Sequence, residues 1–144
     1  MNKHRGFSLL ELLIVVAIIL IIATIAIPSL LRSRQAANES AAVASLKTVS
    51  TAEVNYSTAT LNFYGDMNQL VSAGLVDSGM LTTRSGYNYT INLAPTGLDY
   101  TVFATAANAN MGRFDYYTTP DYVIRYSTDS TRAPANLAGN PVQQ

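Results

Sequence analysis

The sequence predicts an α+β fold, in which a long N-terminal helix packs on an antiparallel sheet. Two observations support this prediction. Residues 7–57 contain a long apolar run followed by a stretch rich in helix-forming residues. Residues 87–127 contain short segments in which apolar and polar residues alternate, separated by turns rich in Gly, Pro and Asp. A helix followed by consecutive strands is the order expected of an α+β domain.

Composition limits the functions that this chain can have. Its 144 residues are 49% hydrophobic and 12% charged, against about 25% charged in an ordinary soluble domain. Nine Lys and Arg balance nine Asp and Glu, so no basic field is available and nucleic-acid binding is not predicted. The absence of cysteine excludes disulfides, thiolate nucleophiles and zinc-thiolate sites.

The apolar surplus lies at the N-terminal end. Residues 12–27 contain one polar residue, Thr24, and residues 7–27 have the length of a membrane-spanning helix. Lys3 and Arg5 precede this segment and predict a cytoplasmic N-terminus, with the rest of the chain outside. A cleaved secretory signal would have a shorter apolar run, and a buried core helix of this length does not suit so small a protein.

A plain membrane anchor fits the length of the segment but leaves Glu11 unexplained, because a carboxylate in a bilayer is costly. A basic leader, then Gly6 and Phe7, then an acid four residues after that Phe at the start of an apolar helix, form one pattern, RGFSLLELLIVVAIILIIATIAIP. This pattern resembles the N-terminus of type IV pilins and of their relatives, the pseudopilins of type II secretion.

The resemblance implies a role for each of these residues. A prepilin peptidase would cut between Gly6 and Phe7 and would methylate the new amine of Phe7. Gly6 suits a scissile bond that must lie extended in a protease cleft. The carboxylate of Glu11 would then pair with the Phe7 amine of the next subunit, because an acid in apolar surroundings is tolerable beside a cation.

The second half of the helix is expected to continue past Pro28. Proline removes one helical hydrogen bond and predicts a kink there, although a helix stop with Ser29 as the next N-cap is the alternative. A stripe at helical spacing would face the sheet, and polar residues would mark the other faces. The stripe is Ala42, Leu46, Val49, Ala52 and Tyr56, and the polar residues are Arg32, Arg34, Glu39, Lys47 and Glu53.

The rest of the chain is expected to form a loop and a meander. Residues 58–85 carry turn signals around one short periodic piece, residues 67–76, which predicts a loop with one short helix. About four antiparallel strands follow, at residues 87–93, 98–106, 113–118 and 122–127. The Pro- and Gly-containing end, residues 133–144, is expected to be a flexible tail, held by the fourth strand or by lateral subunit contacts since no disulfide is possible.

No catalytic chemistry is predicted. The chain has a single histidine, in the leader, and no phosphate-binding glycine motif, so the ATPases of pilus assembly would be separate proteins. No cofactor is expected. Asp115, Asp121 and Asp129 are weak candidates for a calcium site, since acids at such spacing are usually solvated turn residues. The calcium-binding stretch typical of major pseudopilins is missing, which favours a pilin.

The sequence therefore predicts four segments: a cleaved leader at 1–6, a transmembrane and polymerising half-helix at 7–28, a globular domain at 29–132 and the tail at 133–144. The function expected from the resemblance is a structural subunit that is stored in a bacterial inner membrane and then polymerises with identical copies into a type IV pilus at the cell surface. The alternatives are a type II secretion pseudopilin and a membrane-tethered binding domain that does not polymerise.

Overall fold

The computed structural model describes residues 7–127 and 140–142. Its elements, in chain order, are α1 (Leu9–Ala59), α2 (Met67–Ser72), the 3-10 helix η1 (Ser78–Leu81), β1 (Tyr87–Leu93), β2 (Tyr100–Ala106), β3 (Asp115–Thr118), β4 (Arg125–Ser127) and β5 (Asn140–Pro141). The chain divides into two compact units, one ending at Arg34 and one beginning at Gln35. Each unit is described by itself.

Helix α1 contributes residues to both units and contains Pro28 in its interior. The alternative in which the helix stops at this proline is therefore not observed, because the residues on both sides of Pro28 are helical. Proline is tolerated at the cost of one missing backbone donor. The kink expected at this position remains a prediction.

The second unit contains an antiparallel sheet of five strands in the order β1-β2-β3-β4-β5. The sequence predicted about four strands, and the fifth lies in the segment that was expected to be a flexible tail. Pro141 pairs with Arg125 and Asn140 with Tyr126, and the N–H of Val142 donates to the carbonyl of Ile124 over 2.8 Å. Backbone bonds to the β4 region therefore anchor residues 140–142. The other tail residues lie outside the described part of the chain.

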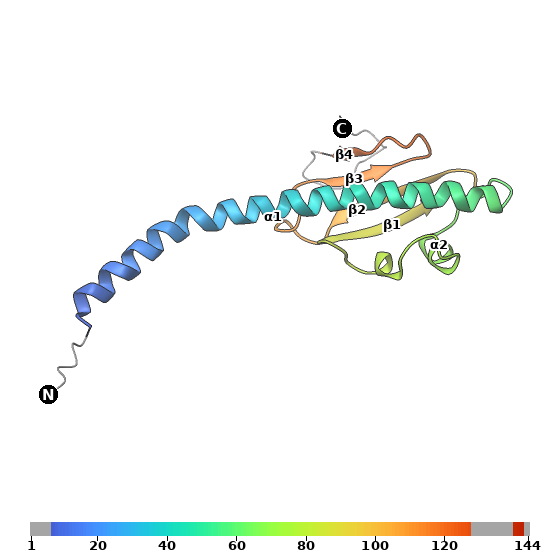
Figure 1. Ribbon diagram of the computed structural model, residues 1–144. Coiled ribbons are helices and arrows are strands. Elements are labelled where there is room, and N and C mark those ends of the chain that lie inside the picture. Colours follow the sequence, from blue (N-terminus) through green and yellow to red (C-terminus); the bar gives the residue numbers. More distant parts are fainter. Residues whose placement is uncertain (1–6, 128–139, 143–144) are drawn as a thin grey trace. The chain divides into compact units, whose positions relative to one another are not determined.

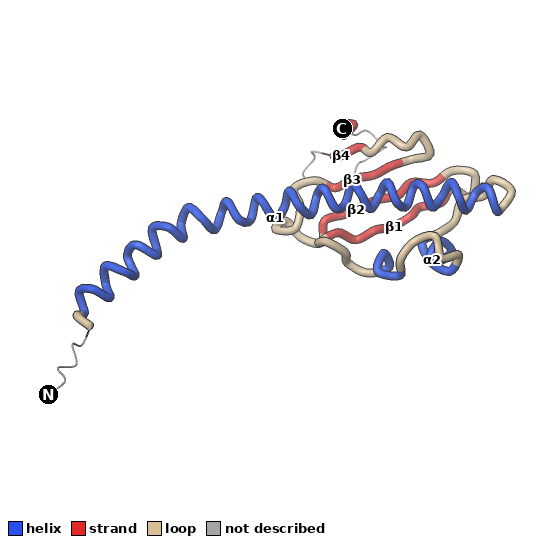
Figure 2. The backbone as a smooth tube through the Cα atoms, viewed as in Figure 1, coloured by secondary structure: helices blue, strands red, loops and turns tan. Residues whose placement is uncertain are grey.

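The core of this unit lies between the sheet and the second half of α1, which crosses the strands in Figure 1. The predicted stripe is confirmed, since four of its residues are buried and Tyr56 is partly buried against the core. The register aligns alternate residues of β1 and β2, with Tyr87 opposite Ala106 and Tyr89 opposite Ala104, so their buried side chains share one face. Figure 2 shows the loops gathered at the ends of these strands.

The connection from α1 to β1 is more ordered than predicted. Two short helices, α2 and η1, replace the single helix expected between residues 58 and 85. Asp66 begins α2 with a capping box, in which its carboxylate accepts from the N–H of Gln69 and the Gln69 side chain accepts from the N–H of Asp66. The carboxylate of Asp77 likewise accepts from the N–H of Gly79 at the start of η1. Side-chain caps therefore give this loop its two helical turns.

Candidate functional site

The first part of α1 is an apolar surface that no other described part of the chain covers. All side chains of residues 7–34 are exposed except Ala23, which is half-buried. They include 17 large apolar side chains, from Phe7, which is 82% exposed, to Leu31. Among the described residues α1 is also the one helix that is long and apolar enough to cross a membrane by length and composition. A continuous apolar surface of this size indicates a site of interaction with lipid or protein.

Glu11 lies at the start of this helix and takes part in its N-terminal cap. The Ser8 hydroxyl accepts from the N–H of Leu10 over 3.3 Å, and the Glu11 carboxylate accepts from the N–H of Ser8 over 3.2 Å. The Ser8 carbonyl accepts the first helical bond, from Leu12. These contacts form a variant of the capping box, in which Ser8 accepts from the second rather than the third helical N–H, and they satisfy two backbone donors that would otherwise lack partners.

The capping role of Ser8 was not recognised in the sequence, although the signal is present there. Ser8 and Glu11 have the S-x-x-E spacing, and an apolar run follows them. Of the other predicted N-terminal site residues, Phe7 is described and exposed, whereas Gly6 lies outside the described residues. Cleavage between the two, methylation of Phe7 and the assembly role of Glu11 remain predictions at this point.

The two acids of α1 that were expected to mark polar faces are buried, so that interpretation was wrong. Glu39 is 6% exposed and Glu53 is fully buried. Their positions continue the spacing of the predicted stripe, since Glu39 precedes Ala42 by three residues and Glu53 follows Val49 by four. The helical period therefore indicates that both residues are buried, whereas their charge led to the wrong expectation that they are exposed.

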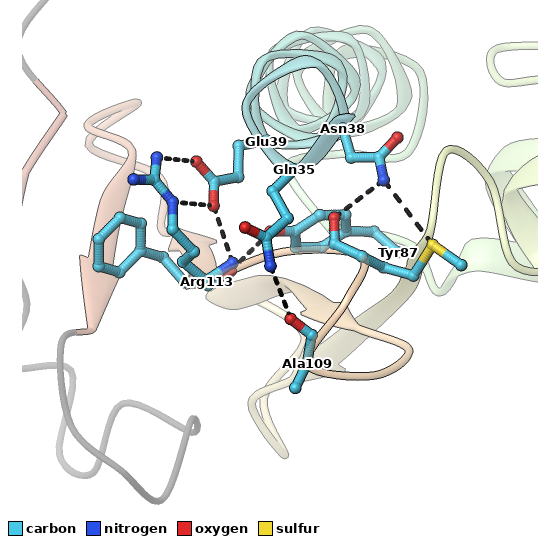
Figure 3. Close-up of polar contacts among 8 residues, drawn as sticks. Gln35, Asn38, Glu39, Tyr87, Ala109 and Arg113 are labelled. Carbon is cyan, nitrogen blue, oxygen red and sulfur yellow. Dashed lines mark hydrogen bonds and ion pairs between the residues drawn. The ribbon is translucent and has the colours of Figure 1, made fainter. Parts of the chain in front are cut away.

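Glu39 is the centre of a set of polar contacts that hold the β2–β3 connection on α1 (Figure 3). Its Oε1 accepts from the N–H of Arg113 over 2.8 Å and from Nε over 3.1 Å. Its Oε2 accepts from a terminal nitrogen of the same guanidinium over 2.8 Å. The carboxylate beside it raises the pKa of the Arg113 guanidinium, which keeps this cation charged.

Two amide side chains extend the same clip along α1. Nε2 of Gln35 donates to the carbonyl of Ala109 over 2.8 Å, and Nδ2 of Asn38 donates to the carbonyl of Met111 over 2.8 Å. Beneath the loop, the Tyr87 hydroxyl donates to the carbonyl of Phe114 over 2.7 Å. Gln35, Asn38 and Glu39 of α1 thus supply hydrogen-bond partners to backbone groups of the β2–β3 connection, which is not paired in the sheet.

Glu53 has a different environment, at the other end of the domain. Its Oε2 accepts from the N–H of Gly65 over 3.0 Å, and its Oε1 has no hydrogen-bond partner among the described residues. Burial of the carboxyl group raises its pKa from 4.5 to about 7, despite the opposing effect of the Gly65 bond. Burial likewise raises the pKa of the hydroxyl of Tyr100, the first residue of β2.

Two of the three weak metal candidates, Asp115 and Asp121, are engaged in other contacts. Oδ1 of Asp115 accepts from the N–H of Ala106 over 2.8 Å. Asp121 lies beyond the opposite end of β3 and pairs with Arg125 over 2.6 Å, which lowers its pKa to about 2. Asp129 lies outside the described residues. Within residues 7–127 and 140–142, no group of three or more His, Cys, Asp or Glu could hold a metal ion.

Comparison with known proteins gives matches that cover part of the chain. The prokaryotic N-terminal methylation motif matches residues 1–27. Over 75 residues the chain is 37% identical to the type IV wide pilus major component PilA4 of Thermus thermophilus, covering 52% of this chain and 57% of that protein. Over 54 residues it is 44% identical to the type IV major pilin protein PilA of Myxococcus xanthus, covering 38% of this chain and 24% of that protein.

The chain therefore spans a little over half the length of the first relative and about a quarter of the second. No solved structure gives a significant match. The likeness to these two proteins is thus a likeness over part of each of them.

Proposed function

We propose that this chain, which carries the N-terminal methylation motif and has a type IV pilin-like architecture, is a structural subunit of a type IV pilus. The observation that carries the proposal is the exposed apolar half of α1, which directly follows the motif. Such a surface is stable in a lipid bilayer or against other apolar helices. A subunit that is first stored in a membrane and later packed in a filament occupies both environments in turn.

In this proposal the leader is removed before assembly. Prepilin peptidase cuts between Gly6 and Phe7 at the cytoplasmic face of the inner membrane, where Lys3 and Arg5 hold the leader, and methylates the Phe7 amine. The similarity to the methylation motif supports this processing. The mature chain retains seven Lys and Arg against nine Asp and Glu, because two of the nine basic residues lie in the leader. Assembly then requires separate ATPases and exports the subunit to the cell surface.

Glu11 is proposed to guide assembly through its charge. The amine created at Phe7 is a cation at the end of an apolar helix, and a carboxylate four residues along a neighbouring helix can neutralise it. The capping box is compatible with this pairing, because a carboxylate has room for about four donors and the cap uses one of its oxygens. A single buried polar pair also sets the register between packed helices.

The first experiment measures the intact mass of the chain in filaments sheared from the surface of the producing bacterium. The expected mass is that of residues 7–144 plus one methyl group. A chain that begins at Met1, or that is missing from sheared filaments while remaining in the membrane, would contradict the proposal. The second outcome would favour a tethered domain that does not polymerise.

The second experiment separates the charge of Glu11 from its capping bond. Glu11→Gln retains an oxygen that can accept from the N–H of Ser8, as glutamine does in capping boxes, whereas Glu11→Ala removes both functions. We expect both variants to be processed and inserted and both to give few filaments in electron micrographs. Ser8→Ala, which removes the hydroxyl but leaves the charge, should form filaments. Normal piliation of Glu11→Gln cells would show that the charge has no role in assembly.

A further inference from the structure

Glu53 is a fully buried acid that the proposed function does not use. It lies in the last two turns of α1, beneath the connection from α1 to α2 at residues 60–66, and its Oε2 accepts from the N–H of Gly65 over 3.0 Å. Gly65 itself is buried. A hypothetical Cβ on this residue would lie 3.0 Å from the ring of Tyr56, so the backbone here approaches α1 closely.

The second oxygen of Glu53, Oε1, is buried and has no hydrogen-bond partner among the described residues. The buried Tyr100 hydroxyl lies near this carboxyl group and interacts with the hydroxyl of Ser50. A buried carboxyl group without a cation beside it costs far more free energy when it is ionised than when it is protonated. A proton on Oε1 would turn this oxygen from an acceptor into a donor.

No described cation faces this carboxyl group. The titratable groups around it are Asp66 at the N-cap of α2, Tyr64 in the connection, Tyr100 on β2 and Tyr122 in the β3–β4 connection. One of these is an acid and three are tyrosines, so each is either neutral or negative. An ionised Glu53 would therefore be a buried charge without compensation, unlike Glu39, which has the Arg113 guanidinium beside it.

The other hydrogen bonds of the connection that Glu53 holds are mostly local: the N–H of Asn62 donates to the carbonyl of Ser57, and Asp66 is bonded within the cap of α2. Leu61 and Asn62 both have positive φ angles, of 57° and 71°. This conformation costs about 1 kcal/mol or more for a residue such as leucine, whereas asparagine tolerates it. Leu61 is 87% exposed. The N–H of Tyr64 donates to the carbonyl of Gly97 over 2.9 Å, and the Tyr64 ring packs edge-on against Tyr100 at 4.6 Å. Loss of the Gly65 bond would thus remove the contact between this segment and the Glu53 side chain, and would leave the Tyr64 bond to Gly97 as its backbone bond to the rest of the domain.

We propose that Glu53 is a proton-operated latch, which holds residues 60–66 on α1 when its carboxyl group is protonated and releases them when it is ionised. Ionisation requires water at the carboxylate, and the shortest way to admit water is to lift the connection that covers it. Release exposes the rings of Tyr64 and Tyr100 at this end of the domain. The burial that raises the pKa of Glu53 to about 7 places the transition near neutral pH.

The direction of the effect follows from linkage between protonation and opening. The closed state binds the proton with a pKa of about 7, and the open state with the ordinary value of 4.5. The stability of the closed state is therefore complete below pH 4.5 and is lost as the pH rises through 7. The two values give an increase in the opening constant of about tenfold between pH 6 and pH 8, and of about 300-fold over the whole range.

The test is hydrogen exchange by mass spectrometry on the full chain in detergent micelles, following peptides that cover residues 60–66 at pH 6 and pH 8. After correction for intrinsic exchange, wild-type protection should fall about tenfold, whereas Glu53→Gln should show a constant protection. Glu39→Gln is the matched control, since it neutralises the other buried acid of α1, and it should retain the wild-type dependence. A pH-independent wild type, or a Glu53→Gln variant with the wild-type dependence, would overturn the proposal.

A second measurement decides the matter if Glu53→Gln does not fold. The infrared spectrum of the folded wild type should contain a protonated carboxyl band at pH 6 that disappears by pH 8, in step with the exchange of residues 60–66. A wild-type carboxyl band that is already absent at pH 6 would refute the latch. The outcome is independent of filament formation, because both measurements are made on dispersed subunits.

Discussion

Replacing Glu39 by alanine should open the clip between α1 and the β2–β3 connection. The carboxylate accepts three hydrogen bonds from Arg113, one from its backbone N–H and two from its guanidinium. The residues lie 74 positions apart in the chain, so the contact joins the helix to the sheet rather than stabilising the helix alone. The N–H of Arg113 depends on Glu39 as its acceptor.

The backbone bond and the ion pair between Glu39 and Arg113 contribute differently to the free energy of unfolding. A hydrogen bond from a backbone N–H to a charged acceptor contributes about 1.5–3 kcal/mol. The Arg113 side chain is 53% exposed, so solvent can replace its partner and the ion pair contributes about 1 kcal/mol or less. Glu39→Ala should therefore cost about 3 kcal/mol. Glu39→Gln retains an acceptor for the backbone N–H and should cost about 1 kcal/mol.

The assay is thermal unfolding of the full chain in detergent, followed by near-ultraviolet circular dichroism of its nine tyrosines. This signal reports the packed domain, whereas far-ultraviolet signals are dominated by α1. At about 4 °C per kcal/mol for a domain of this size, Glu39→Ala should lower Tm by about 12 °C and Glu39→Gln by about 4 °C. Equal shifts for the two variants would refute the importance of the backbone bond.

Three further variants test other parts of the domain by the same assay. Leu46→Ala removes a side chain that is fully buried and should cost about 2–5 kcal/mol, against less than about 1 kcal/mol for Leu81→Ala, at a residue that is 48% exposed; similar costs would contradict the core assignment. Gly86→Ala places a Cβ 2.8 Å from that of Met111 at a φ of +76° and should cost about 2 kcal/mol more than Gly74→Ala, where φ is +70° but the space is open. The Asp121–Arg125 pair contributes stability that is complete above the ordinary pKa of 3.8 and is lost as the pH falls through about 2; Asp121→Asn should lack this contribution. Because Asp121 is 43% exposed, the acid titrations of the wild type and of Asp121→Asn should differ by less than about 0.5 kcal/mol in the free energy of unfolding. A larger difference would contradict the exposed position of Asp121.

The class and order of the fold were predictable because they depend on periodicity. The apolar run, the stripe from Ala42 to Tyr56 and the alternation of residues 87–93 each reflect one repeated geometry, and the structure confirms all three. Strand β5 could not be predicted in this way. It has two residues, which are too few to show the alternation of a strand. Its pairing with β4 also joins residues that are about fifteen positions apart in the sequence.

In the candidate site, too, the features that depend on nearby residues were predictable and those that depend on distant residues were not. The N-terminal motif was recognisable because its residues are close in sequence and each has a local reason. The partners of Glu39 and Glu53 were not, because Arg113 and Gly65 are brought to them by the tertiary fold. Polarity alone assigned both acids to the solvent, although their spacing placed them on the buried stripe. Spacing was the better guide, since a helix cannot rotate a single residue out of its face.

The three acids of α1 have a physical role in common. Each accepts a hydrogen bond from a backbone N–H that has no ladder or helical partner: Ser8 three residues away for Glu11, Gly65 twelve away for Glu53 and Arg113 seventy-four away for Glu39. An apolar helix can pack against loops but cannot satisfy their backbone donors, because its own carbonyls are engaged within the helix. Carboxylates supply those acceptors at three points along α1. The charge state of each is then set by its neighbours: the Arg113 guanidinium keeps Glu39 paired, while Glu53, which faces no described cation, has the environment in which a proton can act as the switch.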